Sequence, residues 1–320
     1  MKATRFLAVG GAAMLALAIV GPVAAQDESP AAASKDPGAA AGAKLFVNMK
    51  GPSAGNPFWA LVEQGAVQAG ADYGVDVQVV APSAESDIPG QIALIEDNTA
   101  QGAAGMAIAV TDAVALNPAI QAAMDQGVKV VWVDSGGDNE GVTYIGTDNA
   151  VGAALAGKYL CDNLEPGSKV AILQGLITTT TGMARADGSK AAVTECGLDL
   201  VMEVPANWDR AQGLAATEDI ITQHPDLAGI FGSNDEMALG AVEALRAADL
   251  LDQVTVVGYD ANPDAREAVL AGDMEATIAQ NPINMGYFGV ESLIKLINGE
   301  TLDPTIDTGV ELITAENAAS

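Results

Sequence analysis

Short apolar runs alternate with longer Ala- and Leu-rich segments from residue 44 to about residue 310, and this alternation limits the possible folds strongly. The short runs are rich in Val, Ile and Leu, which is typical of buried strands, and the segments between them have helical length and spacing. Strands that alternate with helices form parallel sheets with right-handed crossovers. We expect strands at 44–47, 75–80, 105–110, 128–133, 170–173, 200–204, 229–231 and 255–258, and helices that include 57–73, 88–101, 118–126 and 237–248.

The alternation starts again near residues 144–149, where a new helix at 151–164 opens a second half of the chain. Two half-chains that each repeat strand and helix predict an α/β protein with two doubly wound parallel-sheet lobes, which face each other across a cleft. The length of 320 residues is enough for two such lobes.

Polar residues follow three of the expected strands. Asn234 and Asp235 come after 229–231, Asp134 and Ser135 come after 128–133, and Asp260 follows 255–258. Ligands of open α/β sheets bind at the carboxyl ends of the strands. Three strands that end in hydrogen-bonding groups can therefore converge on one small, hydroxyl-rich molecule.

The first 25 residues have the features of a secretory signal peptide. Lys2 and Arg5 form a basic start, residues 6–20 an apolar centre, and residues 23–25 a small-residue cleavage site. Residues 26–43 are rich in Ala, Gly, Pro, Ser and Asp, so we expect a flexible leader. No cysteine lies near the cleavage site and no second long apolar run follows. These features predict a soluble periplasmic protein without a lipid anchor.

The formal net charge is −28, with 14 basic and 42 acidic residues. Such a chain repels nucleic acids and anionic membranes, so we expect neither as a partner. His224 is the single histidine and the sequence has no Cys-x-x-Cys, which argues against a metal site, and we expect no cofactor. Cys161 and Cys196 form one disulfide in an exported protein, or remain two buried thiols.

Seven motifs occur in order along nearly the whole of the chain after the leader. They are Asn-Pro-Phe-Trp at 56–59, Thr-Asp-Asn at 147–149, Leu-Gln-Gly at 173–175, Trp-Asp-Arg at 208–210, Asn-Asp-Glu-Met-Ala-Leu-Gly at 234–240, Val-Gly-Tyr-Asp at 257–260 and Ala-Thr-Ile-Ala-Gln at 276–280. The set resembles the periplasmic sugar-binding proteins of ABC transporters, the type I periplasmic binding proteins, and in particular their ribose- and allose-binding branch.

The resemblance implies two lobes joined by three hinge crossings near Thr147, Asn281 and Thr308. It assigns 44–147 with 281–308 to an N-terminal lobe, and 148–280 with 309–320 to a C-terminal lobe. Binding of a sugar closes the lobes, and the closed form docks on a membrane permease. By analogy, we expect a monomer.

A sugar offers polar edges and two weakly apolar faces, so a good site combines aromatic rings with hydrogen-bonding groups. Phe58 and Trp59 begin a helix after the first strand, and Trp208 lies in a polar loop of the other half. The resemblance implies that these aromatics stack on the sugar. Helical spacing also predicts that one of Phe58 and Trp59 belongs to the core, without showing which.

Five polar residues are candidates for the edge of the sugar. Asp134 and Asp260 can each accept two hydrogen bonds, although either could instead cap the next turn or helix. Asn234 can bridge two hydroxyls, and Asp235 beside it is expected to cap the following helix. The resemblance adds Gln280, at a hinge. Asn56 precedes Pro57 and is expected to cap a helix, with sugar contact as a second role.

Two basic residues complete the candidate site. Arg185 could balance the carboxylates with its five donors, and its alternative is a surface salt bridge. Lys50 follows the first strand. The resemblance to the allose-binding branch includes a lysine at the matching start of this loop. Ser135 departs from both branches, since ribose-type proteins have a basic residue and allose-type proteins an acidic one. The loop 51–55 is also longer, so an aldopentose, a hexose or a sugar alcohol all remain open.

Other functions use the same residues. A sensory receptor, for chemotaxis or for a furanose-like signal, would share the site and bind a chemoreceptor instead. Asp134 and Asp260 could form the carboxylate pair of a glycosidase, but the resemblance is to binding proteins rather than to enzymes. The effector domain of a repressor shares this fold, and the signal peptide and negative charge argue against it.

Overall fold

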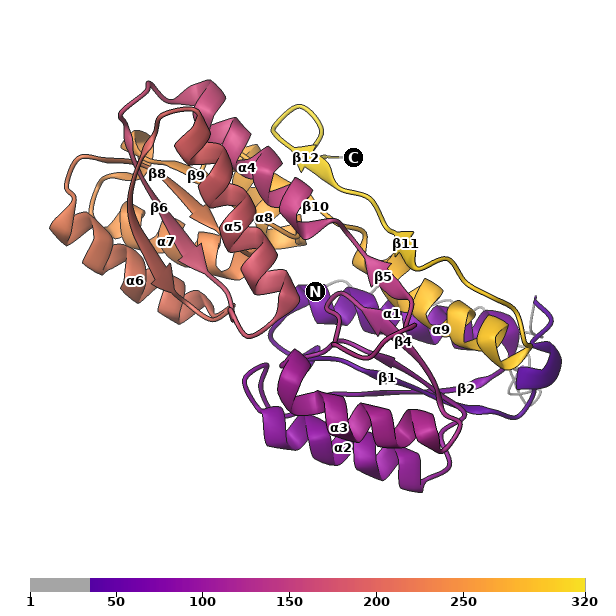
Figure 1. The fold of residues 1–320 in the computed structure, drawn as a ribbon. Helices are drawn as coiled ribbons and strands as arrows, with labels where there is room; N and C mark the ends of the chain where they lie inside the picture. The colour runs from indigo at the N-terminus through magenta and orange to yellow at the C-terminus, as the bar shows by residue number, and fades with distance from the viewer. Residues whose placement is uncertain (1–34, 320) are drawn as a thin grey trace, which may run out of the picture. The chain divides into compact units, whose positions relative to one another are not determined.

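The computed structural model describes residues 35–319, and this part of the chain folds into an α/β protein with two parallel sheets (Figure 1). The expected signal peptide and the first part of the expected leader lie outside the described residues. Within residues 35–319, every helix is too short or too polar to span a lipid bilayer.

The first sheet has six strands, in the order β11-β5-β4-β3-β1-β2, and all neighbours are parallel. Its strands are β1 (Lys44–Asn48), β2 (Asp76–Val80), β3 (Gly105–Ile108), β4 (Lys129–Val133), β5 (Tyr144–Gly146) and β11 (Thr305–Asp307). The strand order reverses at β1, which has β2 on one side and β3 on the other. Such a switch point opens a crevice at the carboxyl ends of the strands.

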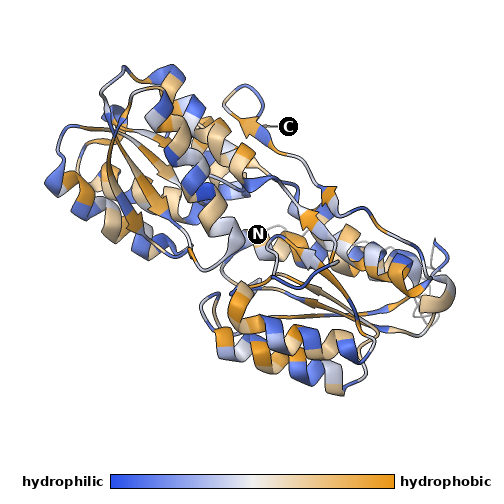
Figure 2. Cartoon of the chain, in the orientation of Figure 1, coloured by the Kyte–Doolittle hydropathy of each residue, from blue (hydrophilic) through white to orange (hydrophobic). Residues whose placement is uncertain are grey.

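Helices cover both faces of this sheet because side chains alternate along its buried strands. Leu45 and Val47 of β1 pack with α1 (Pro57–Tyr73) and α9 (Pro282–Ile297), whereas Phe46 packs with α2 (Ile88–Ala100) and α3 (Ala113–Asp125). Figure 2 shows the hydrophobic colour along the strands and the hydrophilic colour on the outer sides of the helices. The resulting core holds the carboxyl ends of the strands in fixed positions.

Helix α3 begins before the proline at which its sequence pattern predicts a start. The Asp112 side chain accepts hydrogen bonds from the backbone N–H groups of Val114 and Ala115, at 3.0 and 2.8 Å, and so caps the helix at Ala113. Pro118 lies inside the helix. The cap therefore overrides the proline signal.

The second sheet has four parallel strands, in the order β7-β6-β8-β9. They are β6 (Lys169–Gln174), β7 (Asp199–Pro205), β8 (Leu227–Gly232) and β9 (Thr255–Val257). Helices α4 (Asn149–Asn163) and α5 (Thr180–Glu195) pack on one face, and α6 (Arg210–Gln223), α7 (Asp235–Ala247) and α8 (Pro263–Ala271) contribute to the core on the other. Strand β10 (Thr277–Ala279) follows β9 and pairs antiparallel with β12 (Glu311–Ile313).

The chain crosses between the two sheets three times: between β5 and α4, between β10 and α9, and between β11 and β12. Hydrogen bonds join the crossings. The hydroxyl of Thr147 donates to Gln280 Oε1 at 3.2 Å, that of Thr308 donates to the Gln280 carbonyl at 3.1 Å, and Asn281 Nδ2 donates to the Thr308 carbonyl at 2.8 Å. The predicted fold of two doubly wound lobes with three crossings is confirmed.

Residues 35–43 differ from the flexible leader that their composition predicts. They contain a 3-10 helix, η1 (Gly38–Ala40), and Ala40 is completely buried. The Lys35 amide donates to the Asp72 carbonyl at 2.8 Å, and the Lys35 ammonium lies 3.4 Å from Glu291. Contacts with α1 and α9 therefore fix this segment, because its small residues fit closely against helices.

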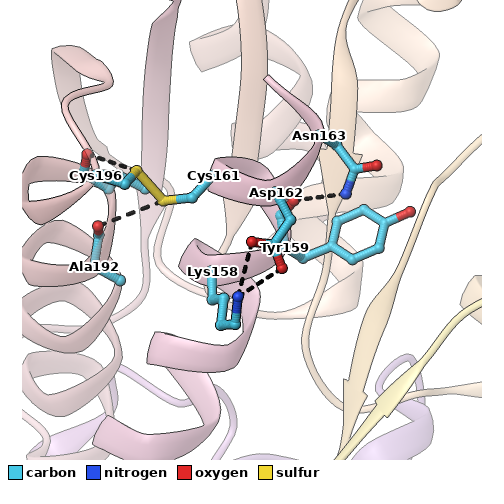
Figure 3. The surroundings of a disulfide bond; sticks show 8 residues. Lys158, Tyr159, Cys161, Asp162, Asn163, Ala192 and Cys196 are labelled. Atoms are coloured by element: carbon cyan, nitrogen blue, oxygen red, sulfur yellow. Dashed lines mark hydrogen bonds and ion pairs between the residues drawn. A yellow bond between two sulfur atoms is a disulfide. The ribbon is translucent and has the colours of Figure 1, made fainter. Parts of the chain in front are cut away.

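Cys161 and Cys196 form the predicted disulfide, with their Cα atoms 6.0 Å apart (Figure 3). The bond joins α4 to the residue that ends α5. The two helices also pack closely, since a Cβ atom at Gly157 would lie 2.7 Å from the Ala192 side chain. In the chain-entropy model, a crosslink over 35 residues stabilises the fold by roughly 3–4 kcal/mol.

Candidate ligand-binding site

A cavity with about 260 Å³ of empty space lies at the carboxyl ends of strands from both sheets. Ten of the eleven residues that the sequence predicts for the site line this cavity, together with Glu85 and Thr181. The lining consists of Lys50, Asn56, Phe58, Trp59, Glu85, Asp134, Thr181, Arg185, Trp208, Asn234, Asp260 and Gln280.

Phe58 and Trp59 enter the cavity from the first turn of α1. The Asn56 side chain caps this helix by accepting from the Phe58 amide at 3.1 Å, and Pro57 supplies the fixed backbone angle of the first helical position. The two rings meet edge to face at 4.9 Å between centroids. Both line the cavity and both belong to the core of the first sheet, so the expected division into one core and one site aromatic is wrong.

Trp208 reaches the cavity from the loop after β7, in the second sheet. Asn207 and Trp208 have left-handed backbones, with φ of 51° and 67°, a conformation that costs about 1–3 kcal/mol for a non-glycine residue. Asn234 supports the loop by donating to the Trp208 carbonyl at 3.3 Å. A Cβ atom at Gly175 would lie 2.1 Å from the indole ring, so only glycine leaves room for it. Strained backbone of this kind is common where a side chain is aimed at a ligand.

Lys50 and Asp134 form a buried ion pair at 2.8 Å, with each side chain 3% exposed. The Lys50 ammonium also lies 5.6 Å from the ring centroids of both Trp59 and Trp208, within the range of a cation–π contact. Asp134 thus meets a cation of the site, and the alternative that it only caps the next turn is not supported. One cation is shared by an acid and two rings.

Arg185, on α5, forms the second charged centre. Its Nη1 lies 3.4 Å from Asp260 Oδ1, its Nη2 donates to Gln280 Oε1 at 3.2 Å, and its Nε donates to Asn149 Oδ1 at 2.9 Å. The guanidinium stacks 3.7 Å above the ring of Tyr259. Because the side chain is only 3% exposed, the alternative of a surface salt bridge is wrong.

Asp260 follows β9 in a left-handed backbone, with φ of 122°. Its carboxylate accepts a short hydrogen bond from Gln280 as well as the Arg185 contact. Burial raises the pKa of Asp260 to about 7, and the positive charge of Arg185 opposes that rise. Asn262, not Asp260, occupies the cap position of α8, which removes the capping alternative for Asp260.

Asn234, rather than Asp235, is the cap of α7. The Asn234 oxygen accepts from the Met237 amide at 2.9 Å, so half of its amide is already used by the protein. The Asp235 carboxylate is fully buried behind it and accepts from the Thr277 hydroxyl at 2.6 Å and the Asn262 amide at 2.7 Å. Burial raises the pKa of Asp235 well above its ordinary value. The expectation that Asp235 caps the helix is therefore wrong.

Ser135 is the one predicted site residue that the structure does not bring to the cavity. Its hydroxyl is buried and donates to the Val110 carbonyl at 2.8 Å. The left-handed backbone of Asp134, with φ of 64°, turns the chain so that the next side chain faces the end of β3. Ser135 therefore ties two strand ends together.

Glu85 and Thr181 line the cavity without having been predicted. Glu85 lies in the connection between β2 and α2, and no pattern marks it, because it is five residues beyond the end of its strand. Thr181 belongs to a run of threonines that turn and capping roles alone could explain. Thr179 does cap α5, through a 2.9 Å bond from the Gly182 amide, and Thr181 donates to the Asp134 carbonyl at 3.1 Å.

The cavity thus combines aromatic rings with two cations and three carboxylates, which can stack on a ring and satisfy several hydroxyls. Within residues 35–319, no group of three or more histidine, cysteine, aspartate or glutamate side chains is arranged to hold a metal ion.

The model of a family described as periplasmic binding protein domain matches residues 49–301. The D-ribose/D-allose-binding protein of Pseudomonas aeruginosa is 34% identical over 82% of this chain and 86% of its own length. The ribose import binding protein of Escherichia coli is 33% identical, over 81% of this chain and 86% of its own. An ABC transporter periplasmic solute-binding protein from Actinobacillus succinogenes, solved with bound D-allose, superposes with a TM-score of 0.81 and 29% identity, covering 87% and 99% of the two chains.

Proposed function

The chain belongs to the periplasmic binding protein family, and we propose that it is the solute receptor of an ABC importer for a monosaccharide or a sugar alcohol. The observation that carries this proposal is the composition of the cavity. Aromatic rings from α1 and from the loop after β7 supply apolar surfaces, and two ion pairs supply fixed donors and acceptors between them. A sugar presents just these two kinds of surface.

Delivery requires that the ligand shifts the protein toward one arrangement of its lobes. Hydrogen bonds already join the segment after β4 to the first turn of α5, beside the cavity: Thr181 donates to the Asp134 carbonyl, and the Gly136 amide donates to the Thr180 hydroxyl at 3.1 Å. A ligand that contacts residues of both sheets binds more tightly when these contacts form, and so favours that state. We infer that this state is the one a permease recognises, and that the receptor is a monomer.

The named relatives bind ribose and allose, but we do not assign either sugar to this chain. Ser135 is turned away from the cavity, and Glu85 adds a carboxylate to it. Both features bear on which hydroxyls the cavity can recognise. The proposed ligands are therefore aldopentoses, hexoses and sugar alcohols.

The arrangement favours binding over hydrolysis. A glycosidase needs one carboxyl group as a proton donor and a second as a nucleophile or base. Here Asp134 is paired with Lys50, and Asp260 with Arg185 and Gln280, so neither carboxyl group is left free to act as the nucleophile or base. We infer that the protein binds its ligand unchanged and that it acts in the periplasm after removal of residues 1–25.

Thermal unfolding against a panel of pentoses, hexoses and polyols tests the proposal. A ligand present at 100 times its dissociation constant adds about 2.7 kcal/mol of stability, which is readily visible as a shift of Tm. We expect one or a few members to raise Tm in a concentration-dependent manner. A protein that has been unfolded, dialysed and refolded, and that responds to no member, would contradict it.

A further inference from the structure

We propose that Glu85 determines ligand specificity by accepting a hydrogen bond from a donor group of the bound molecule. This inference rests on the proposed function, because it concerns the same cavity. Glu85 comes from the connection between β2 and α2, which contributes no other residue to the lining of the inner cavity.

Two donors of one helix orient the carboxylate of Glu85. Its Oε1 accepts from Trp59 Nε1 at 2.7 Å and from Asn56 Nδ2 at 3.1 Å. Asn56 is fixed as the cap of α1, and Trp59 is fixed in the core. Both donors use the same oxygen, and within residues 35–319 no hydrogen bond engages the second oxygen, which is therefore available to a ligand. A pre-oriented acceptor of this kind is typical of residues that select one functional group.

The backbone around Glu85 is adapted to its side chain. A Cβ atom at Gly51 would lie 2.6 Å from Glu85 Cγ, so the glycine allows the loop after β1 to pass directly over the carboxylate stem. The loop thus covers one side of the Glu85 side chain, and the residue as a whole is half-buried.

Glu85 also lies at the boundary of a second, outer cavity, which Asn56 and Trp208 line as well. The polar residues of this outer cavity include Ser83, Asn207 and Gln212. The group that Glu85 recognises must therefore be at the end of the ligand that points toward the outer cavity.

The charges of the inner cavity indicate which chemistry Glu85 selects. Asp134 is paired with Lys50, and Asp260 with Arg185, whereas the donors that the described chain offers to Glu85 are both uncharged. Burial raises the pKa of Glu85, and the nearby Lys50 charge opposes the rise. A carboxylate in this position is stabilised by a further donor and repels an anion. Hydroxyl and ammonium groups of a ligand both provide that donor, whereas a carboxylate or phosphate group facing Glu85 does not.

The test compares the wild type with Glu85→Gln by calorimetric titration of the best ligand from the panel. In the variant, Trp59 and Asn56 hold the amide oxygen, so the amide NH₂ faces the ligand and opposes its donor. We expect Kd to rise at least tenfold. Glu96→Gln, an exposed residue of the following helix α2, serves as the matched control and should leave Kd unchanged.

Singly deoxygenated and amino-substituted analogues of that ligand then identify the contacted group. One deoxy analogue should bind the wild type at least tenfold more weakly than the parent, and should lose little further affinity in Glu85→Gln. The amino analogue at that position distinguishes the two donors: tighter binding than the parent assigns an ammonium, and weaker binding assigns a hydroxyl.

Trp59→Phe separates ligand contact from mere positioning, since it removes one donor to Glu85 and keeps the carboxylate. The sensitivity to the same deoxy analogue should persist in this variant. The role of Glu85 would be overturned if Glu85→Gln and the wild type had equal Kd values, or if every analogue lost the same affinity in both proteins. Either result would leave the sugar-binding function intact. A wild type that binds no sugar would instead overturn the proposed function itself.

Discussion

The ammonium of Lys50 lies 2.8 Å from the carboxylate of Asp134, and the two residues follow β1 and β4, which are separated by β3 in the first sheet. The pair is buried, and its cation also lies against the rings of Trp59 and Trp208. One ion pair thus connects two strand ends of the first sheet to Trp208, in the loop after β7 of the second sheet. Loss of either partner leaves an uncompensated buried charge.

Asp134→Ala should lower the free energy of unfolding by about 3–5 kcal/mol, because it leaves the Lys50 ammonium buried without its counter-ion. Denaturant titration measures the change. The double variant Lys50→Met with Asp134→Leu removes both charges and should recover most of the lost stability. A double variant less stable than Asp134→Ala would show that the pair does not carry this energy.

Asp260→Ala and Arg185→Ala should each weaken ligand binding by more than about 2 kcal/mol, since each leaves buried polar partners without a hydrogen bond. Calorimetric titration with the ligand identified in the panel gives the two dissociation constants. If one variant binds as the wild type does, its residue does not contribute to the site.

Stability should fall as the pH rises from about 5 to about 7. Burial raises the pKa of Asp260 to about 7, whereas an unfolded aspartate titrates near ~3.9. In this interval the folded state keeps a proton that the unfolded state has lost, so the free energy of unfolding decreases by up to about 1.4 kcal/mol per pH unit. Asp235 and Glu85, whose pKa values burial also raises, act in the same direction.

Urea denaturation at several pH values measures that slope, and Asp260→Asn is the variant to compare. The Asp260→Asn variant should have a smaller slope of unfolding free energy against pH, because it lacks the titration of Asp260. The slope that Asp235 contributes should remain. Stability that rises over this interval, or a slope that Asp260→Asn leaves unaltered, would contradict the assignment.

Gly175→Ala should displace Trp208, because the new Cβ atom would lie about 2.1 Å from the indole ring. We expect a loss of about 1–3 kcal/mol of stability from overpacking, a change in tryptophan fluorescence and weaker ligand binding. Gly136→Ala is the control, since its Cβ atom would lie at an ordinary 3.4 Å from the nearest atom. Equal behaviour of the two variants would show that the Trp208 loop is not held by this contact.

Removal of the disulfide should reduce stability and leave affinity unchanged. Cys161→Ser with Cys196→Ser should cost roughly 3–4 kcal/mol. Cys196 is the cap residue directly after α5, and Arg185 lies inside this helix, 11 residues earlier. At the helical rise the two residues are about 16 Å apart. Titration of unfolded, unreduced wild-type protein should give no free thiol, and two thiols would refute the bridge.

The local sequence pattern predicts the alternation of strands and helices and the polar residues at strand ends. The three crossings, and Gln280 in the cavity, are predicted only by the resemblance to sugar-binding proteins. The failures have a different origin. Ser135 follows Asp134 directly, yet a single left-handed residue turns it toward Val110. Glu85 carries no strand-end signal, and only tertiary contact with Trp59 and Asn56 brings it to the site.

The same limit applies to helix ends. Asn234 and Asp235 are both good capping residues, and their order in the chain does not show which of them caps α7. The tertiary structure determines which residue caps the helix. The Asp235 carboxylate accepts hydrogen bonds from the Thr277 hydroxyl and the Asn262 amide, and Asn234 therefore caps α7. Side-chain competition of this kind is a tertiary effect.

Titration by intrinsic fluorescence tests the account most directly, since two of the three tryptophans, Trp59 and Trp208, line the cavity. The protein should first be unfolded, dialysed and refolded, so that any copurified ligand is removed. The account predicts a saturable fluorescence change with at least one aldopentose, hexose or sugar alcohol, and its loss in Asp260→Ala. No saturable change with any of these compounds, or the same change in Asp260→Ala, would contradict it.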